Sequence, residues 1–341
     1  MITNAGHALR RAWHRLADAA APPPVILMYH RIAQDAQDPW QLCVSPANFA
    51  AQMQVIRQRR RPMRLAELTR QLQQGQCPRG AVVITFDDGY RDNLLTALPV
   101  LEANDVPATV FCTAGYIGVE EPFWWDRLAT LLLAPERLPP TLALDVNGQQ
   151  WRKDVGRAES YPAAERASDR SATSDSTDAS PRLALYREVW GWLRPLADAD
   201  RALALAAIAG WSADAGADET PIALSHQQLS ALAASPLIEI GAHSVTHAAL
   251  PALAPQEQRH EIGQSKAQLE AMIGRPVLNF AYPFGDQSPQ TAALVRDAGF
   301  HSSCTTAAGA VRTGTDLFQL PRIGVGDWDG QTFAQSLRGM R

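Results

Sequence analysis

The sequence lacks the features that would place it in a membrane, in a disulfide framework or on nucleic acid. Its 341 residues include only four cysteines, none in a CxxC pair, which favours free thiols over disulfides. The net charge is −4, so there is no basic excess for binding nucleic acid. No run reaches the about 18 consecutive apolar residues of a spanning helix. We therefore expect no nucleic-acid partner and no transmembrane segment.

The first residues also lack the apolar stretch of a secretory signal, although Arg10, Arg11 and Arg15 make them basic. Leu9, Trp13 and Leu16 would share one side of a helix there. The sequence thus predicts a helical extension over residues 1–21, either packed on the following domain or associated with a membrane surface. Without a signal, the expected location is the cytoplasm.

The most informative stretch is Ala81–Tyr90, AVVITFDDGY. Its apolar, β-branched run fits a strand buried on both faces, as in a parallel sheet. The carboxyl end of such a strand is where α/β enzymes place their chemistry, and here it delivers Asp87 and Asp88. Two carboxylates this close repel each other unless a cation keeps them ionised. The alternative is that they cap the next helix.

Further buried runs alternate with helical patterns, which predicts an α/β fold with a parallel sheet or barrel. The predicted strands are 25–29, 81–86, 107–112, 237–240, 279–282, 300–304 and 320–325. The barrel is predicted to span residues 22–341, with residues 118–220 as a helical and loop insertion. Within that insertion, a hairpin is expected around Asn147-Gly148. Residues 153–181 contain almost no large apolar side chains and are expected to be disordered.

Two histidines, His243 and His247, follow the predicted strand at 237–240. The carboxyl ends of parallel strands meet at one rim, so both imidazoles would lie near Asp88. Two neutral imidazoles and one carboxylate make a divalent-metal site with open positions for water. A bound metal lowers the pKa of water from about 15.7 to about 7 and polarises a carbonyl group. Asp87 would stay ionised as a base, so amide or ester hydrolysis is the expected reaction.

Several motifs together resemble the polysaccharide deacetylases of carbohydrate esterase family 4, which share a NodB homology domain. The motifs are TFDDG (Thr85–Gly89), HSVTH (His243–His247), the PFG of AYPFG (Ala281–Gly285), MYHR (Met28–Arg31) and LPRIGV (Leu320–Val325). The resemblance covers roughly residues 25–117 and 224–327. It implies an irregular (β/α)7-type barrel that binds zinc, or cobalt or nickel instead, through Asp88, His243 and His247. It also implies that Asp87 is the general base.

The resemblance further implies that the third motif lines the substrate groove, through Tyr282, Pro283, Phe284 and Gly285, with a backbone N–H near Phe284 helping to hold the oxyanion. In the insertion, Trp125 is a candidate for stacking on a sugar ring, with core packing as the alternative.

The chain departs from the family pattern at two points. Many members carry an arginine that orients the base where this chain has Ala281, and we expect Arg322 to fill that role. The late histidine that acts as general acid in many members is also missing. Members similar to the exopolysaccharide de-N-acetylases instead place this histidine after the first strand, so the resemblance assigns the acid role to His30.

These observations predict a metal-dependent enzyme that removes N-acetyl groups from a polysaccharide or a lipid-linked saccharide. An O-deacetylase or another amide hydrolase could share the same barrel. Two other classes remain open: an iron oxygenase, which uses the same ligand types, and a glycan-binding module without activity.

Overall fold

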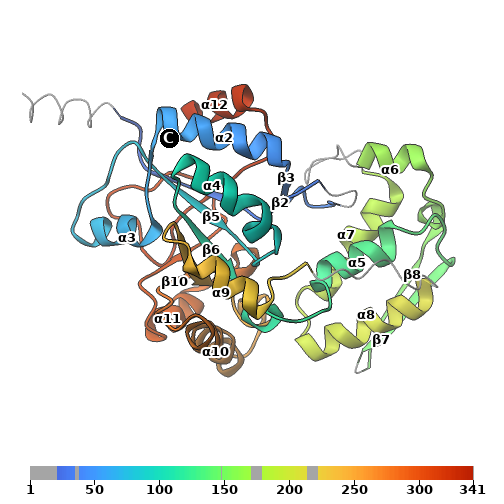
Figure 1. Cartoon of the computed structure of the whole chain (residues 1–341). Helices are drawn as coiled ribbons and strands as arrows, with labels where there is room; N and C mark the ends of the chain where they lie inside the picture. The colour runs from blue at the N-terminus through green and yellow to red at the C-terminus, as the bar shows by residue number, and fades with distance from the viewer. Residues whose placement is uncertain (1–20, 35–37, 147, 170–178, 213–221, 341) are drawn as a thin grey trace, which may run out of the picture.

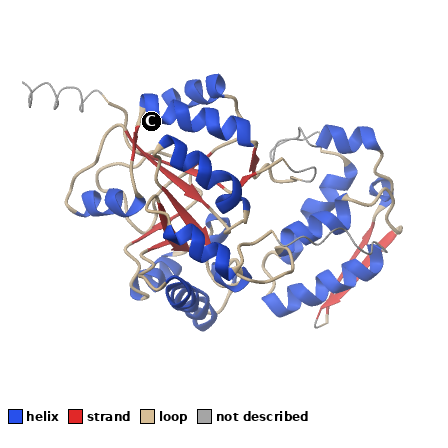
Figure 2. Cartoon of the chain, viewed as in Figure 1, coloured by secondary structure: helices blue, strands red, loops and turns tan. Residues whose placement is uncertain are grey.

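The computed structural model describes residues 21–34, 38–146, 148–169, 179–212 and 222–340. At its centre lies one sheet of parallel strands (Figure 2). The strand order is β11-β10-β9-β6-β5-β1-β12, and the short β4 lies beside β5. The strands are β1 (Val25–Tyr29), β4 (Arg61–Pro62), β5 (Ala81–Phe86), β6 (Ala108–Cys112), β9 (Ile238–Ala242), β10 (Asn279–Ala281), β11 (Ser302–Cys304) and β12 (Ile323–Gly324).

Strand β5 lies in the middle of the sheet, and all of its residues are buried. It pairs with β1 from Val25–Val82 to Tyr29–Phe86 and with β6 from Ile84–Ala108 onward. Burial on both faces explains its uninterrupted apolar run, because helices cover both sides of a parallel sheet. The predicted strand at 81–86 is confirmed.

The sheet curls until its two edges approach each other, which confirms the expected α/β barrel type. Strand β12 pairs with β1, while Leu320, just before β12, bridges Cys304 of β11. The predicted strand at 320–325 is shorter than expected, because Pro321 has no N–H to donate and the N–H of Arg322 bonds to the carbonyl of Ala307. Within the described residues, closure therefore depends on a bridge at Leu320 rather than on a continuous ladder.

Helices surround this sheet (Figure 1). They are α2 (Pro46–Arg59), α3 (Leu65–Gln73), α4 (Leu98–Asn104), α9 (His226–Ala234), α10 (Pro255–Ile273), α11 (Pro289–Asp297) and α12 (Gly330–Gly339), with the π-helical turn η1 (Asn93–Ala97) and the 3-10 turns η2 (Ala114–Tyr116), η4 (Leu250–Ala252) and η5 (Pro283–Gly285). The short strands β2 (Arg31–Ile32) and β3 (Cys43–Val44) pair beside the sheet. Helix α10 is followed by Gly274, whose φ of 68° forms a left-handed cap.

A second body of structure, which we call the helical lobe, spans the described residues between Phe123 and Ser212 (Figure 1, right). It contains α5 (Trp124–Leu133), β7 (Thr141–Val146), β8 (Gln149–Asp154), η3 (Gly156–Glu159), α6 (Ala163–Asp169), α7 (Pro181–Leu193) and α8 (Asp198–Ser212). The antiparallel hairpin β7–β8 confirms the predicted one. The lobe has its own apolar core, which Tyr90 and Ala223 of the surrounding chain join.

The expectation of disorder over 153–181 is wrong for the described part of that stretch. Strand β8, the turn η3 and helix α6 occupy it as far as Asp169. Buried Asp169 accepts hydrogen bonds from the hydroxyl of Tyr161 (2.8 Å) and from the backbone N–H of Ser180 (3.0 Å). Polar contacts thus order a segment whose composition lacks apolar anchors. Residues 170–178 lie outside the described residues.

The predicted helical extension over 1–21 also falls almost entirely outside the described residues and stays a prediction. Across the part of the chain that is described, no helix is long and apolar enough to cross a membrane.

Candidate metal and catalytic centre

The turn after β5 brings two neighbouring carboxylates to the rim of the barrel. Asp87 and Asp88 are 2% and 3% exposed. Asp88 adopts a φ of 73° and Gly89 a φ of 85°, a left-handed region that is costly for a residue with a side chain. Asp88 thus shares the unusual backbone of Gly89, as expected where a functional turn is held by its surroundings.

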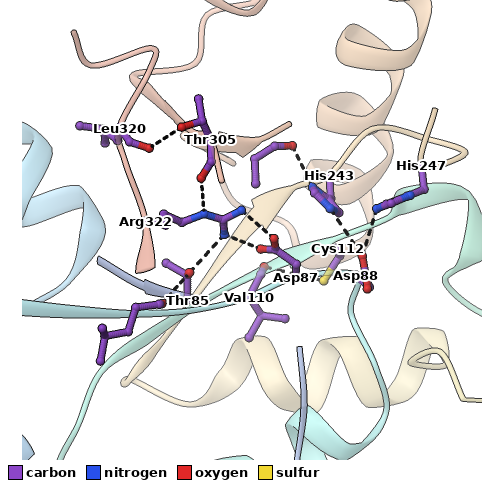
Figure 3. A network of polar contacts seen from close by, with 12 residues as sticks. Thr85, Asp87, Asp88, Val110, Cys112, His243, His247, Thr305, Leu320 and Arg322 are labelled. Carbon is purple, nitrogen blue, oxygen red and sulfur yellow. Dashed lines mark hydrogen bonds and ion pairs between the residues drawn. The ribbon is translucent and has the colours of Figure 1, made fainter. Parts of the chain in front are cut away.

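Asp88, His243 and His247 come together as predicted (Figure 3). One ligand atom from each lies within 4.8 Å of the others. The Nε2 atoms of His243 and His247 lie 3.5 Å and 3.3 Å from Oδ1 of Asp88. All three side chains are buried. Strands β5 and β9 supply them, so the topology of the sheet creates the cluster.

The state of these side chains fits a divalent metal ion. Oδ1 of Asp88 is buried and has no hydrogen-bond partner among the described residues. Nδ1 of His243 lies 2.8 Å from the carbonyl oxygen of Ala281, so it carries the proton and donates, which leaves Nε2 as the free ligand atom. Burial lowers the pKa of His243 to about 4, so its imidazole is neutral near pH 7. Two neutral imidazoles and a carboxylate are ligands that zinc prefers.

Arg322 holds Asp87 from the side opposite the histidines (Figure 3). Its Nη1 and Nη2 donate to Oδ1 and Oδ2 of Asp87 at 2.6 Å and 2.7 Å, and Nε donates to the carbonyl of Thr305. Burial would raise the pKa of Asp87, but the ion pair with Arg322 outweighs it and holds that pKa well below its usual range. The contact that the resemblance implied for Arg322 is therefore present.

His30 follows β1 at the same rim. It is partly exposed and lines a cleft of about 830 Å³ together with Met28, Trp40 and Trp328. Burial raises the pKa of Asp88, but the close electrostatic contact with His247, followed by that with His30, lowers it below its usual value. His30 is thus close enough to act electrostatically on the centre, while its role as general acid stays a prediction.

Trp125 packs against a metal-ligand candidate instead of facing a substrate groove. It is 5% exposed, its ring stacks on Phe123 at 4.7 Å, and its ring centroid lies 4.4 Å from that of His247. Its Nε1 donates to the hydroxyl of Tyr90 at 2.8 Å. The structure therefore favours core packing, the alternative given for Trp125, over stacking on a sugar ring, because the ring is buried and its donor is engaged.

The third motif is only partly available to a substrate. Tyr282 is fully buried and donates its hydroxyl to the carbonyl of Phe318 at 3.0 Å, so a substrate contact by its side chain is contradicted. Pro283 is buried as well. Phe284 and Gly285 are partly exposed, with φ values of 60° and 76°. The ring of Phe284 meets that of His247 at 4.4 Å.

Sequence reasoning missed the residues that support the centre. Tyr90 donates to Asp126 at 3.0 Å and thereby ties the aspartate turn to the helical lobe. Glu261 of α10 accepts hydrogen bonds from the loop between the two histidines. A signal was present for Glu261: Gln258, Glu261 and Ser265 recur at helical spacing on the buried side of α10. A polar residue on such a face needs a partner.

The polysaccharide deacetylase family profile matches residues 74–136 and 193–303, a little over half of the chain. YxkH of Bacillus subtilis (strain 168), named a candidate polysaccharide deacetylase, is 27% identical over 105 residues, which are 30% of this chain and 38% of that relative. This chain thus matches well under half of the length of that relative.

Two solved structures resemble the whole fold. The deacetylase PplD of Streptococcus pyogenes, in complex with acetate, has a TM-score of 0.56 at 18% identity, over 93% of this chain and 98% of PplD. A de-N-acetylase of Aggregatibacter actinomycetemcomitans has a TM-score of 0.55 at 12% identity, over 92% and 98%. At these identities the structures establish the fold, and the sequence profile establishes the kinship. The chain therefore belongs to the polysaccharide deacetylase family.

Proposed function

We propose that the chain is a metal-dependent deacetylase that hydrolyses the N-acetyl amide of a glycan. The observation that carries the proposal is the buried cluster of Asp88, His243 and His247, with ligand atoms within 4.8 Å of one another, beside the separately ionised Asp87. A divalent ion held there, zinc or otherwise cobalt or nickel, would make bound water acidic and polarise the acetyl carbonyl.

In this proposal Asp87 accepts the proton of the attacking water. Arg322 keeps the carboxylate ionised and fixes its orientation through two parallel hydrogen bonds. A carboxylate with so low a pKa is a weak base. It can therefore accept a proton only from an unusually acidic water. The role of Asp87 as base thus depends on the metal ion that Asp88, His243 and His247 would hold, because that ion would make the water acidic.

His30 serves as the general acid for the departing amine. It lines a cleft of about 830 Å³ and follows β1, the strand that pairs with β5, after which the two aspartates lie. Without a proton, the amine nitrogen would have to leave as an anion, which is a poor leaving group. A proton from an imidazolium must therefore reach the nitrogen as the carbon–nitrogen bond breaks. His30 also lies close enough to the two aspartates to contribute to the lowering of their pKa values.

An N-acetylated glycan is the substrate we favour. Family membership implies an acetylated carbohydrate. One structural neighbour is titled a de-N-acetylase, and another was solved with acetate. The open cleft beside His30 offers room for sugar units next to the reacting one.

The test is acetate release from N-acetylglucosamine oligomers, after the metal is removed by chelation and zinc is titrated back without oxygen. We expect acetate in proportion to zinc added, and none from Asp87→Asn. Release from O-acetylated sugars alone would identify an O-deacetylase. No acetate from any acetylated saccharide would reject deacetylation.

A further inference from the structure

The loop between the two histidines has a backbone that needs external support. Ser244 and His247 both have left-handed backbones, with φ values of 60° and 55°. Residues with side chains adopt this region only when the surroundings compensate for the strain. His247 is also a metal-ligand candidate, so the direction of its imidazole depends on this backbone.

The barrel holds two backbone carbonyl groups of this loop. The carbonyls of Ser244 and Val245 accept hydrogen bonds from the N–H groups of Ala114 and Gly115 at 3.0 Å and 2.9 Å. A Cβ on Gly115 would lie only 2.6 Å from the oxygen of Val245, so the glycine permits this approach. These bonds fix one side of the loop.

Two N–H groups of the loop donate to one side chain. Oε2 of Glu261 accepts from the N–H of Val245 at 2.8 Å and from that of Thr246 at 2.9 Å. Its Oε1 accepts from the hydroxyl of Thr246 at 3.0 Å. Glu261 is 7% exposed. Hydrogen bonds to a buried carboxylate are stronger than neutral ones, and an unpaired N–H in such a place is costly.

The helical lobe holds the next peptide group of the loop. Nη2 of Arg201, from α8, lies 3.3 Å from the carbonyl of Thr246 and 3.0 Å from Oδ1 of Asp198. Arg201 is 1% exposed, and its guanidinium lies over the ring of Trp124. Thr246, the residue before His247, is therefore fixed through its N–H and hydroxyl by α10 of the barrel and through its carbonyl by α8 of the lobe.

We propose that Glu261 is a positioning residue that sets the metal affinity of the centre, by holding the backbone of Val245 and Thr246 so that His247 faces Asp88. The inference rests on the metal site of the proposed function and adds a residue that touches neither metal nor substrate. Without Glu261, two N–H groups lose their acceptor, and the left-handed backbone at Ser244 and His247 relaxes. The imidazole of His247 then leaves the common ligand sphere.

The test compares zinc binding by chelator-treated, full-length variants, measured by competition with a chromophoric chelator. Glu261→Ala removes all three hydrogen bonds. Glu261→Gln keeps an oxygen for the N–H groups but loses the charge. The control is Glu270→Gln on the same helix, because Glu270 accepts the N–H of Val277 at 2.9 Å, away from the centre. Thermal unfolding of each metal-free variant is recorded alongside.

We expect Glu261→Ala to weaken zinc binding by about 10- to 100-fold, the usual effect of losing a residue that supports a ligand. Glu261→Gln should fall between Glu261→Ala and the parent, and Glu270→Gln should bind zinc as the parent does. A role in folding alone would lower the unfolding temperature and leave the zinc affinity unchanged.

If Glu261→Ala does not fold, Glu261→Gln decides the matter. Parental zinc affinity in folded Glu261→Gln, or an equal loss in Glu270→Gln, would overturn the inference. A parent protein that binds zinc but releases no acetate would reject the proposed function and leave this inference standing. A parent that binds no zinc would reject both.

Discussion

The barrel and the helical lobe contribute to the same centre in different ways. The barrel supplies every candidate that reacts or binds metal, and it supplies them from the carboxyl ends of parallel strands. The lobe is built from a hairpin and packed helices with a separate apolar core, and it reaches the centre through Trp125 and Arg201. Strand ends thus provide the chemistry, while the lobe supports the outer side of one ligand, His247.

The largest expected effect contrasts two buried arginines, Arg322 of the barrel and Arg182 of the lobe. Arg322→Met leaves the carboxylate of Asp87 buried without its partner, and breaking such a pair costs about 3–5 kcal/mol. Arg182 donates only to backbone carbonyls, such as those of Ala158 and Leu132, so Arg182→Met strands no charge. Urea unfolding should show the larger loss in Arg322→Met, together with loss of acetate release. Equal losses with retained activity would contradict the contrast.

His30→Ala separates catalysis from metal binding within the barrel. Loss of a general acid reduces turnover by about 100- to 10,000-fold. Zinc stoichiometry should not change, because His30 is outside the ligand cluster. Turnover on the oligomers and zinc content of the same sample provide both readings. Turnover near the parental rate would remove His30 from the mechanism.

Trp125→Leu tests the contact of the lobe with His247. The smaller side chain leaves a cavity and loses the hydrogen bond to Tyr90, a cost of about 2–3 kcal/mol. Zinc affinity should fall together with stability. Trp192→Leu is the matched control, since the ring of Trp192 contacts that of Trp151 in the hairpin, whereas the ring of Trp125 contacts His247. Equal zinc affinity in both variants would show that the lobe does not support the ligand.

The smallest effect is the acid sensitivity of the metal-free barrel. The folded pKa of His243, about 4, lies below the ordinary value of 6.5, so below pH 6.5 the unfolded chain binds a proton first. Stability therefore falls from about pH 6.5 to about pH 4, by about 1 kcal/mol between pH 7 and pH 5.5. Urea unfolding in chelator should show less of this loss in His243→Gln than in His301→Gln, a change at an exposed site. Identical slopes would contradict the assignment.

The barrel and the lobe also differ in how much of them could be predicted from the sequence. Buried runs and their order predicted the barrel, and parallel strands with a common rim predicted the meeting of Asp88, His243 and His247. Orientation was harder to predict. Tyr282 and Trp125 lie beside the centre, but their side chains point into the core. This orientation was hard to predict because the residues they contact, such as Phe318 and Tyr90, are distant in sequence.

The strained backbone conformations and the residues that support them could not be predicted from the sequence either. Aspartate and histidine adopt a positive φ more often than most residues, but the residue type of Asp88 or His247 does not require one, because the compensation comes from tertiary contacts. The resemblance led to Arg322 even though it lies 235 residues from Asp87. No comparable motif pointed to Glu261 or Arg201.

Anomalous X-ray diffraction at the zinc edge, from crystals of the zinc-loaded protein, tests the central claim most directly. We predict one peak at the rim of the barrel, within about 2.0–2.2 Å of a carboxylate oxygen of Asp88 and of Nε2 of His243 and His247. A zinc-loaded crystal without a peak there, or with its peak held by other residues, would contradict the account.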